Sequence, residues 1–149
     1  MSAQIFEFPD KLADSEKITI NLGFVDLGYI DLLVDDGFYS NRTDFIRTAI
    51  RNQLGNHAEQ AKKSIDRQTL ELGLRAFSRS DLQGVKANGE MLTIKVLGLV
   101  TIAFDVTPEL ALATIASINV LGALHASKAV KAALASRIRP YTQSLHLHF

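Results

Sequence analysis

A short stretch near the amino end decides the fold: Lys17-Ile18-Thr19-Ile20-Asn21-Leu22. Its polar and apolar side chains alternate strictly, which is the period-two pattern of a strand with one buried face. After it, apolar residues recur at three and four positions over 25–36 and again over 45–54, as on the buried side of a helix. The first 55 residues therefore predict a strand, a helix, a tight turn and a second helix.

The turn between the two predicted helices carries signals of its own. Gly37 stands where a helix commonly ends in a left-handed residue. Ser40 can accept a hydrogen bond from a free backbone N–H of the second helix, and Asp44 lies near the positive end of that helix dipole. Gly55 is expected to mark the end of the second helix.

The predicted strand needs a partner that the two helices cannot supply, because they offer its backbone no hydrogen bonds. One possibility is a later strand of the same chain. The other is the same strand of a second subunit, related by a two-fold axis. The second arrangement would bury Ile18, Ile20 and Leu22 against four helices.

The segments 17–22, 31–37 (DLLVDDG) and 39–51 (YSNRTDFIRTAIR) resemble, in order and spacing, the ribbon-helix-helix fold of CopG-like transcriptional regulators of the MetJ/Arc superfamily. The resemblance implies a homodimer whose paired strands form a two-stranded ribbon. In that family the polar face of the ribbon enters the major groove of DNA, where base edges distinguish all four base pairs.

Carried over by position, the resemblance assigns base contacts to Lys17, Thr19 and Asn21. Lysine can donate to guanine acceptors, asparagine can pair bidentately with adenine, and threonine offers a hydroxyl and a methyl group. The alternative interpretation is a solvated strand face. The family often has a basic residue where Asn21 stands and a proline where Gly23 stands, which implies a weaker contact and a looser entry into the first helix.

The resemblance also places phosphate contacts at the start of the second helix, on Ser40, Asn41 and Arg42. Free N–H groups and the helix dipole make such a terminus an anion site, and phosphate contacts fix register without reading sequence. The alternative is a helix cap beside an exposed arginine. The two roles are compatible.

The second half of the chain predicts further strands and helices. We expect a strand over 69–77, a short helix from a cap at Ser80 to Lys86, and a strand or hairpin over 91–103 bent near Gly98. Thr107 and Pro108 predict a helix that ends near Ser117. We expect another strand over 118–124, and then a helix from a cap at Ser127 to about Arg137.

A faint internal repeat links two of these strands. The segment 94–99 (IKVLGL) matches 118–123 (INVLGA) at a spacing of 24 residues. A compact α+β module is the preferred interpretation, stacked solenoid-like coils come second, and a chance match is the third alternative. In either arrangement the expected role is burial and assembly.

Composition excludes several classes of protein. The chain has no cysteine, so disulfide scaffolds, thiolate metal sites and cysteine nucleophiles are excluded. His146 and His148 lack a third ligand and predict an exposed tail rather than a metal site. No nucleophile elbow, phosphate-binding loop or His-Glu pair is present, so we expect neither an enzyme nor a cofactor.

Targeting and membrane insertion are not expected either. The first ten residues show no basic segment followed by an apolar one, and polar residues interrupt the uncharged stretch 110–127. We therefore expect a cytoplasmic protein. Charge is uneven, because residues 1–54 hold five basic and nine acidic groups, a net charge of −4, and residues 55–149 hold eleven and seven, a net of +4. DNA binding by the first part must then depend on where its few cations lie.

The sequence thus predicts an α+β protein with an N-terminal ribbon-helix-helix dimerisation and DNA-binding domain (1–55), a linker or helix extension (56–68) and a C-terminal α+β assembly or effector module (69–149). The expected function is sequence-specific transcriptional regulation, as a repressor. The expected partners are double-stranded DNA, a second copy in a homodimer or higher closed homo-oligomer, and an unknown effector, but no membrane. The alternatives are an antitoxin and a structural assembly protein that polymerises through its C-terminal half.

Overall fold

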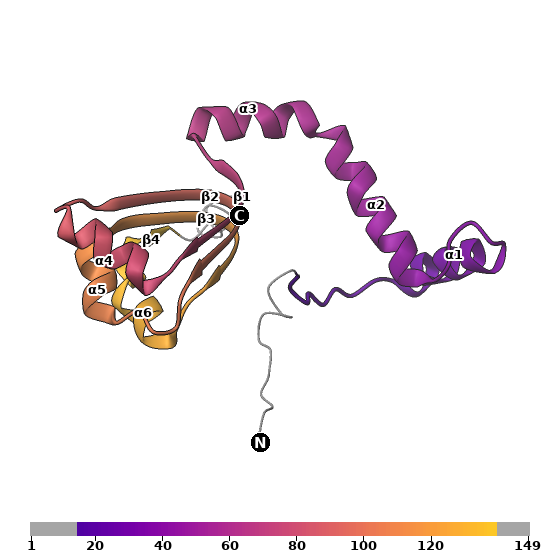
Figure 1. Cartoon of the computed structure of the whole chain (residues 1–149). Helices are drawn as coiled ribbons and strands as arrows, with labels where there is room; N and C mark the ends of the chain where they lie inside the picture. Colours follow the sequence, from indigo (N-terminus) through magenta and orange to yellow (C-terminus); the bar gives the residue numbers. More distant parts are fainter. Residues whose placement is uncertain (1–14, 140–149) are drawn as a thin grey trace, which may run out of the picture. The chain divides into compact units, whose positions relative to one another are not determined.

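The computed structural model describes residues 15–139 and has an α+β fold (Figure 1). Its contacts divide the chain between Ala61 and Lys62. We call the described residues before this boundary the N-terminal unit and those after it the C-terminal unit.

The N-terminal unit begins with an exposed segment, 15–23, that belongs to no helix or strand of the chain. Helix α1, Phe24–Asp35, follows, and confirms the helix predicted over 25–36. It ends as expected at Gly37, which has φ +86°, and the N–H of Phe38 donates to the carbonyl of Leu33 at 3.0 Å. This left-handed ending turns the chain toward the second helix.

Helix α2 is Arg42–Asn56, and its start differs from the prediction by one residue. Asn41, not Ser40, is the N-cap, because its side-chain oxygen accepts the N–H of Asp44 at 2.8 Å. Gly55 does not end the helix either. It stays within α2, and a third helix, α3, Ala58–Gln68, follows after His57. The polar stretch expected as a linker or helix extension is therefore helical over most of its length.

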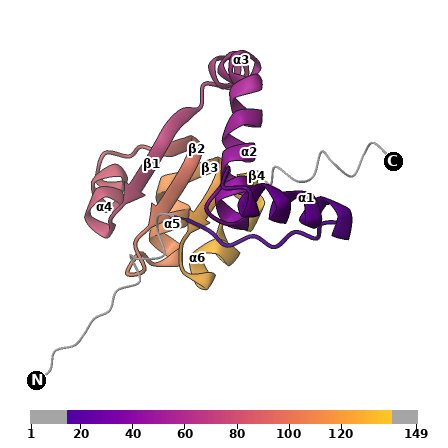
Figure 2. The ribbon, with the colours of Figure 1, turned by 90° about the vertical axis from the view of Figure 1, so that its right-hand side faces the viewer.

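The C-terminal unit is built on one parallel sheet in which the strands lie in chain order, β1-β2-β3-β4. The strands are β1 Glu71–Phe77, β2 Leu92–Ile102, β3 Ile115–His125 and β4 Ile138–Arg139. Figures 1 and 2 show the connecting helices α4, α5 and α6 on the same side of the sheet. The chain therefore advances by one strand and one helical connection at a time, as stacked coils do.

The bounds of these connections refine the predictions. Helix α4, Arg79–Ala87, is capped by Ser78 rather than Ser80, because Ser78 and Asp81 form a reciprocal capping box. Helix α5, Pro108–Thr114, starts with the expected Thr107 cap but stops before Ser117, since strand β3 already begins at Ile115. Ser127 caps α6, Lys128–Ala133, as predicted, and a 3₁₀ turn, η2, Ala135–Arg137, follows it.

The internal repeat has a structural meaning, because it sets the register between strands. Gly98 of β2 pairs with Gly122 of β3, which is the 24-residue spacing seen in the sequence, and Gly73 of β1 pairs with Gly98. A Cβ built at Gly98 would overlap the carbonyl oxygen of Gly73, and one at Gly122 would overlap that of Gly98. The strands approach so closely at this row that only glycine fits. The arrangement is α+β, and its strands stack as coils, the second of the two arrangements considered.

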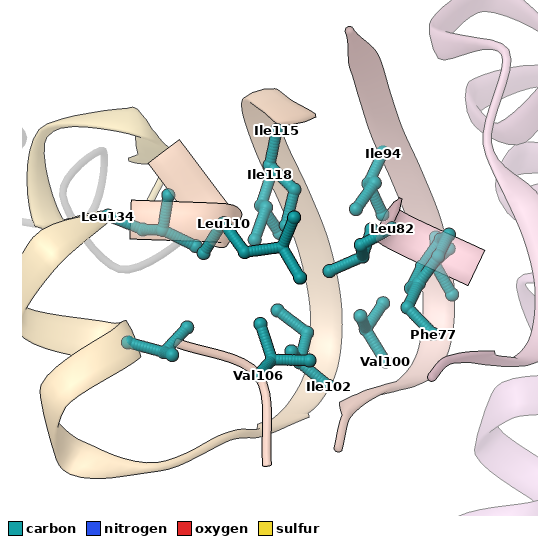
Figure 3. Close-up of a cluster of buried hydrophobic side chains, with 13 residues drawn as sticks. Phe77, Leu82, Ile94, Val100, Ile102, Val106, Leu110, Ile115, Ile118 and Leu134 are labelled. Carbon is teal, nitrogen blue, oxygen red and sulfur yellow. The ribbon is translucent and has the colours of Figure 1, made fainter. Parts of the chain in front are cut away.

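The core of the C-terminal unit lies between the sheet and the helices (Figure 3). Strand β2 contributes four alternate residues to it, and each helix contributes at least one leucine or valine. The fully or nearly fully buried members are Leu82, Ile94, Val96, Val100, Ile102, Val106, Ala111, Ile115, Ile118, Val130 and Leu134. This close-packed layer holds α4, α5 and α6 on one face of the sheet, and none of these three helices lies on the opposite face, which we call the face without helices.

The uncharged stretch 110–127 is divided between helix α5 and strand β3. Across the described residues, no helix has the length and apolar character required to cross a membrane.

Candidate nucleic-acid interface

The segment 17–22 is exposed on both sides in the single chain. Lys17, Thr19 and Asn21 are exposed on one side. On the other side the exposed fractions are 73% for Ile18, 57% for Ile20 and 37% for Leu22. Three large apolar side chains at alternate positions of one short segment are rarely all exposed to water in a folded protein.

An apolar groove lies beside this segment, on helices α1 and α2. It has a volume of about 380 Å³ and is lined by Ile20, Leu22, Asp26, Tyr29, Ile30, Phe45, Ile46, Ala49 and Ile50. Eight of these nine side chains are hydrophobic. Ile20 and Leu22 thus continue into the apolar surface of the two helices.

The hydrophobic core of the N-terminal unit is incomplete in the single chain. Among its described residues only Ile30 is buried. Large hydrophobic side chains are exposed along both helices and in the turn between them, namely Phe24, Val25, Tyr29, Leu32, Phe38, Ile50 and Leu54. This is little apolar burial for a unit of this size, because buried apolar surface has to offset the conformational entropy lost on folding.

The start of helix α2 is organised by short hydrogen bonds. The side chain of Asn41 accepts the N–H of Asp44, and the carboxylate of Asp44 accepts the N–H of Ser40 at 2.9 Å. The backbone N–H groups of Arg42 and Thr43, in the first turn, have no acceptor among the described residues. This terminus therefore keeps two donors for an anion, next to one carboxylate that already occupies part of the site.

Arg42 is held by an ion pair that joins the two helices. Its Nε donates to Oδ1 of Asp31 and its Nη2 donates to Oδ2, both at 2.8 Å. The hydrogen bond from Arg42 holds the pKa of Asp31 below its usual value of 3.8, and the same pair raises the pKa of Arg42. In the free chain the guanidinium is therefore already neutralised by a carboxylate.

The predicted site residues thus fall into two groups in the N-terminal unit. Lys17, Thr19 and Asn21 lie on one extended segment, and Ser40, Asn41 and Arg42 are consecutive at the start of α2. Sequence reasoning missed Asp31 as the partner of Arg42. The available signal was an acid in the second half of α1 and a base at the first residue of α2, on either side of the turn that contains Gly37. Within the described residues, no cluster of three metal-binding side chains occurs, and His146 and His148 lie outside the described range.

A family model for the ribbon-helix-helix transcriptional regulator family matches residues 13–131. The match covers well over half of the chain and spans both units. The chain belongs to this family. It therefore belongs among DNA-binding regulators, which typically act as dimers. No curated protein and no solved structure matches the chain.

The family match includes the segment 17–22, which pairs with no strand among the described residues. The family match also continues through strands β1, β2 and β3. The stacked coils are therefore part of what this family model describes in the chain.

Proposed function

We propose that this chain is a homodimeric, sequence-specific transcriptional repressor that acts in the cytoplasm and performs no catalysis. In the proposed dimer the segments 17–22 of two subunits pair as an antiparallel ribbon. The observation that carries the proposal is the exposed row of Ile18, Ile20 and Leu22, continuous with an apolar groove on α1 and α2. Pairing would bury this row on both subunits and satisfy the backbone of both segments.

The proposed base contacts follow from the alternation along the ribbon. When the apolar positions turn toward the helices, Lys17, Thr19 and Asn21 turn away from them together. A two-stranded ribbon fits the major groove, and each bidentate side-chain contact to a base contributes about 1–3 kcal/mol of discrimination. Two-fold symmetry presents every contact twice, so a pseudo-palindromic operator is expected.

The proposed phosphate contacts lie at the start of α2. The free backbone N–H groups of Arg42 and Thr43 support this assignment, together with the hydroxyl of Ser40 and the amide of Asn41. Arg42 joins them by exchanging its bond to Asp31 for a bond to phosphate. The negative charges of Asp31 and Asp44 weaken this phosphate contact, and the unit has no large basic surface. The proposal therefore assigns recognition of the operator mainly to the base contacts of the ribbon.

The test is a double substitution on the ribbon. An operator is first isolated by selecting DNA fragments with the purified full chain. Lys17→Ala with Asn21→Ala should then leave the dimer intact and lower operator affinity by at least about 100-fold, because two contacts are lost on each subunit. Dimerisation is measured by sedimentation, and affinity is measured at fixed salt concentration.

The chain offers a matched control with the same residue types. Lys95 and Asn119 lie opposite each other in the sheet of the C-terminal unit. Lys95→Ala with Asn119→Ala removes the same charge and the same amide but leaves the proposed ribbon unchanged. Operator binding should stay at the level of the unmodified chain. Equal losses in the two double variants, or no loss in the ribbon variant, would defeat the assignment.

A further inference from the structure

Strand β1 leaves one edge of the sheet open in the C-terminal unit. Within the described residues it pairs only with β2, so one row of its backbone N–H and C=O groups has no partner (Figure 1). The strand has seven residues and contains no proline. Edges of this length are normally shortened, bulged or covered, because they accept strands of other chains.

The side chains of β1 divide between the two faces of the sheet. Leu72 and Leu74 are on the face without helices and are exposed by 73% and 61%. Glu71 and Arg75 are on the helix-covered face, because they pair in register with the buried Val96 and Val100 of β2. Despite this placement both charged side chains are exposed, and they form a salt bridge with each other.

The sequence of β1 is symmetric about Gly73 in the chemistry of its side chains. Leucines stand one residue away on each side, and opposite charges, Glu71 and Arg75, stand two residues away. In an antiparallel pair of two such strands centred on Gly73, residue 71 faces residue 75 of the partner and residue 72 faces residue 74. Each acid then meets a base and each leucine meets a leucine, twice over.

We propose that β1 pairs with β1 of a second copy of this chain, antiparallel and with the two-fold axis at Gly73. The paired edges join two four-stranded sheets into one. Opposite charges directly across an antiparallel pair attract, whereas a parallel, in-register pair would place Glu71 against Glu71 of the other copy and repel. The charge pattern therefore selects the antiparallel arrangement, and no Cβ at Gly73 obstructs the close approach of the strands at the axis.

This contact is separate from the proposed DNA-binding ribbon. It uses residues of the C-terminal unit alone, and it would exist whether or not the segment 17–22 reads DNA. It gives the stacked coils a role in assembly, because it is isologous and closes on itself after two copies. Combined with dimerisation through the N-terminal unit, it allows a closed oligomer larger than a dimer or a dimer joined at two places.

Site-directed disulfides test the register directly, because the full chain contains no cysteine of its own. One preparation carries Leu72→Cys and the other, enlarged by a tag, carries Leu74→Cys. After mixing and mild oxidation, the three possible disulfide-linked products differ in size. Directly opposed residues lie closest and diagonal ones lie about 7–8 Å apart. The mixed 72–74 product should therefore form several times faster than the 72–72 or 74–74 product.

A second cysteine pair controls for random collision. Thr93 is exposed on the same face as Leu74 but lies on β2, away from the proposed axis. Thr93→Cys mixed with Leu74→Cys should give little product. If the mixed 72–74 product forms no faster than the 72–72 product or than the Thr93 control, the proposed pairing is wrong, and the edge is open or is covered by another occupant.

Charge reversal supplies an independent arm of the same experiment. Glu71→Arg in both preparations places two like charges across each end of the pair and should reduce the 72–74 product severalfold. Adding Arg75→Glu restores complementarity and should restore the yield. Both sites are exposed, so circular dichroism should show an unchanged fold. The proposal is overturned if Glu71→Arg leaves the yield of the 72–74 product unchanged, or if the yield stays low after Arg75→Glu is added.

Discussion

Gly98→Ala should destabilise the C-terminal unit strongly. Gly98 has φ +144°, a region that residues with a Cβ adopt only at a cost of about 1–3 kcal/mol. In addition, the new Cβ would overlap the carbonyl oxygen of Gly73. This oxygen belongs to the backbone, so it cannot move away as the end of a flexible side chain could. Strands β1 and β2 must then separate locally. We expect a loss of at least about 3 kcal/mol in the free energy of unfolding.

The matched control is Gly84→Ala on helix α4. Gly84 is exposed, has no atom within 4 Å of a built Cβ and lies inside a helix. Alanine there should stabilise the chain by up to about 1 kcal/mol, because it restricts the unfolded state and favours the helix. The same substitution should thus have opposite signs at the two positions.

The assay is urea unfolding of the full chain, followed by circular dichroism for the unmodified chain and both variants. The quantity compared is the change in the free energy of unfolding, taken from the transition that reports the C-terminal unit. The two variants should differ by about 4 kcal/mol or more, from the strain and helix-propensity values together. A difference within about 1 kcal/mol would refute the argument that the glycine row fixes the spacing of the stacked strands.

Two further predictions concern the N-terminal unit. Asp31→Asn should raise affinity for the selected operator and steepen its salt dependence by about 0.9 in the log–log slope for each newly neutralised phosphate, because it frees Arg42. Arg42→Ala should remove most of this gain, and weaker binding by Asp31→Asn would show that the ion pair supports the complex instead. Ile20→Lys should dissociate the dimer in sedimentation, because it places a charge in the apolar row, whereas Thr19→Lys on the polar side should not. Dimers of equal strength in both variants would contradict the proposed ribbon.

Local signals in the sequence predicted most helix and strand positions. The Thr107-Pro108 start, the left-handed ending at Gly37 and the Ser127 cap are all found in the structure, because each depends on a few adjacent residues. The capping positions that differ, Asn41 instead of Ser40 and Ser78 instead of Ser80, lie one or two residues from those expected. Each of these helix starts holds more than one residue able to act as the cap, and the choice depends on where the first helical turn begins.

Long-range features were harder to predict. The 24-residue spacing between Gly98 and Gly122 could be read, but it could not show by itself that the strands stack in parallel, because two matching segments are too few to define a solenoid. The third member, Gly73, stands in the same Leu-Gly-Leu run as Gly98, but it lies 25 rather than 24 residues before it, and the residues preceding that run differ. The ion pair between Asp31 and Arg42 was missed because it depends on how two helices meet, which residue spacing alone does not determine.

The candidate DNA site likewise has one part that local sequence signals predicted and one part that depends on long-range structure. Alternation identified Lys17, Thr19 and Asn21 as one face, and the structure describes this segment as exposed on both faces in one chain. Base reading by that face would depend on the proposed dimer bound to DNA, which the sequence of one chain does not describe. The incomplete core around Ile30 is the physical reason to expect the dimer.

Amide hydrogen exchange of residues 17–22, followed by NMR on the full chain, is the decisive test of the proposed two-subunit ribbon. If two copies pair through this segment, its alternate amides should be protected at concentrations where the chain sediments as a dimer, and the protection should fall on dilution below the dissociation constant. Exchange at the rate of an unstructured peptide while the chain is still dimeric would contradict the account.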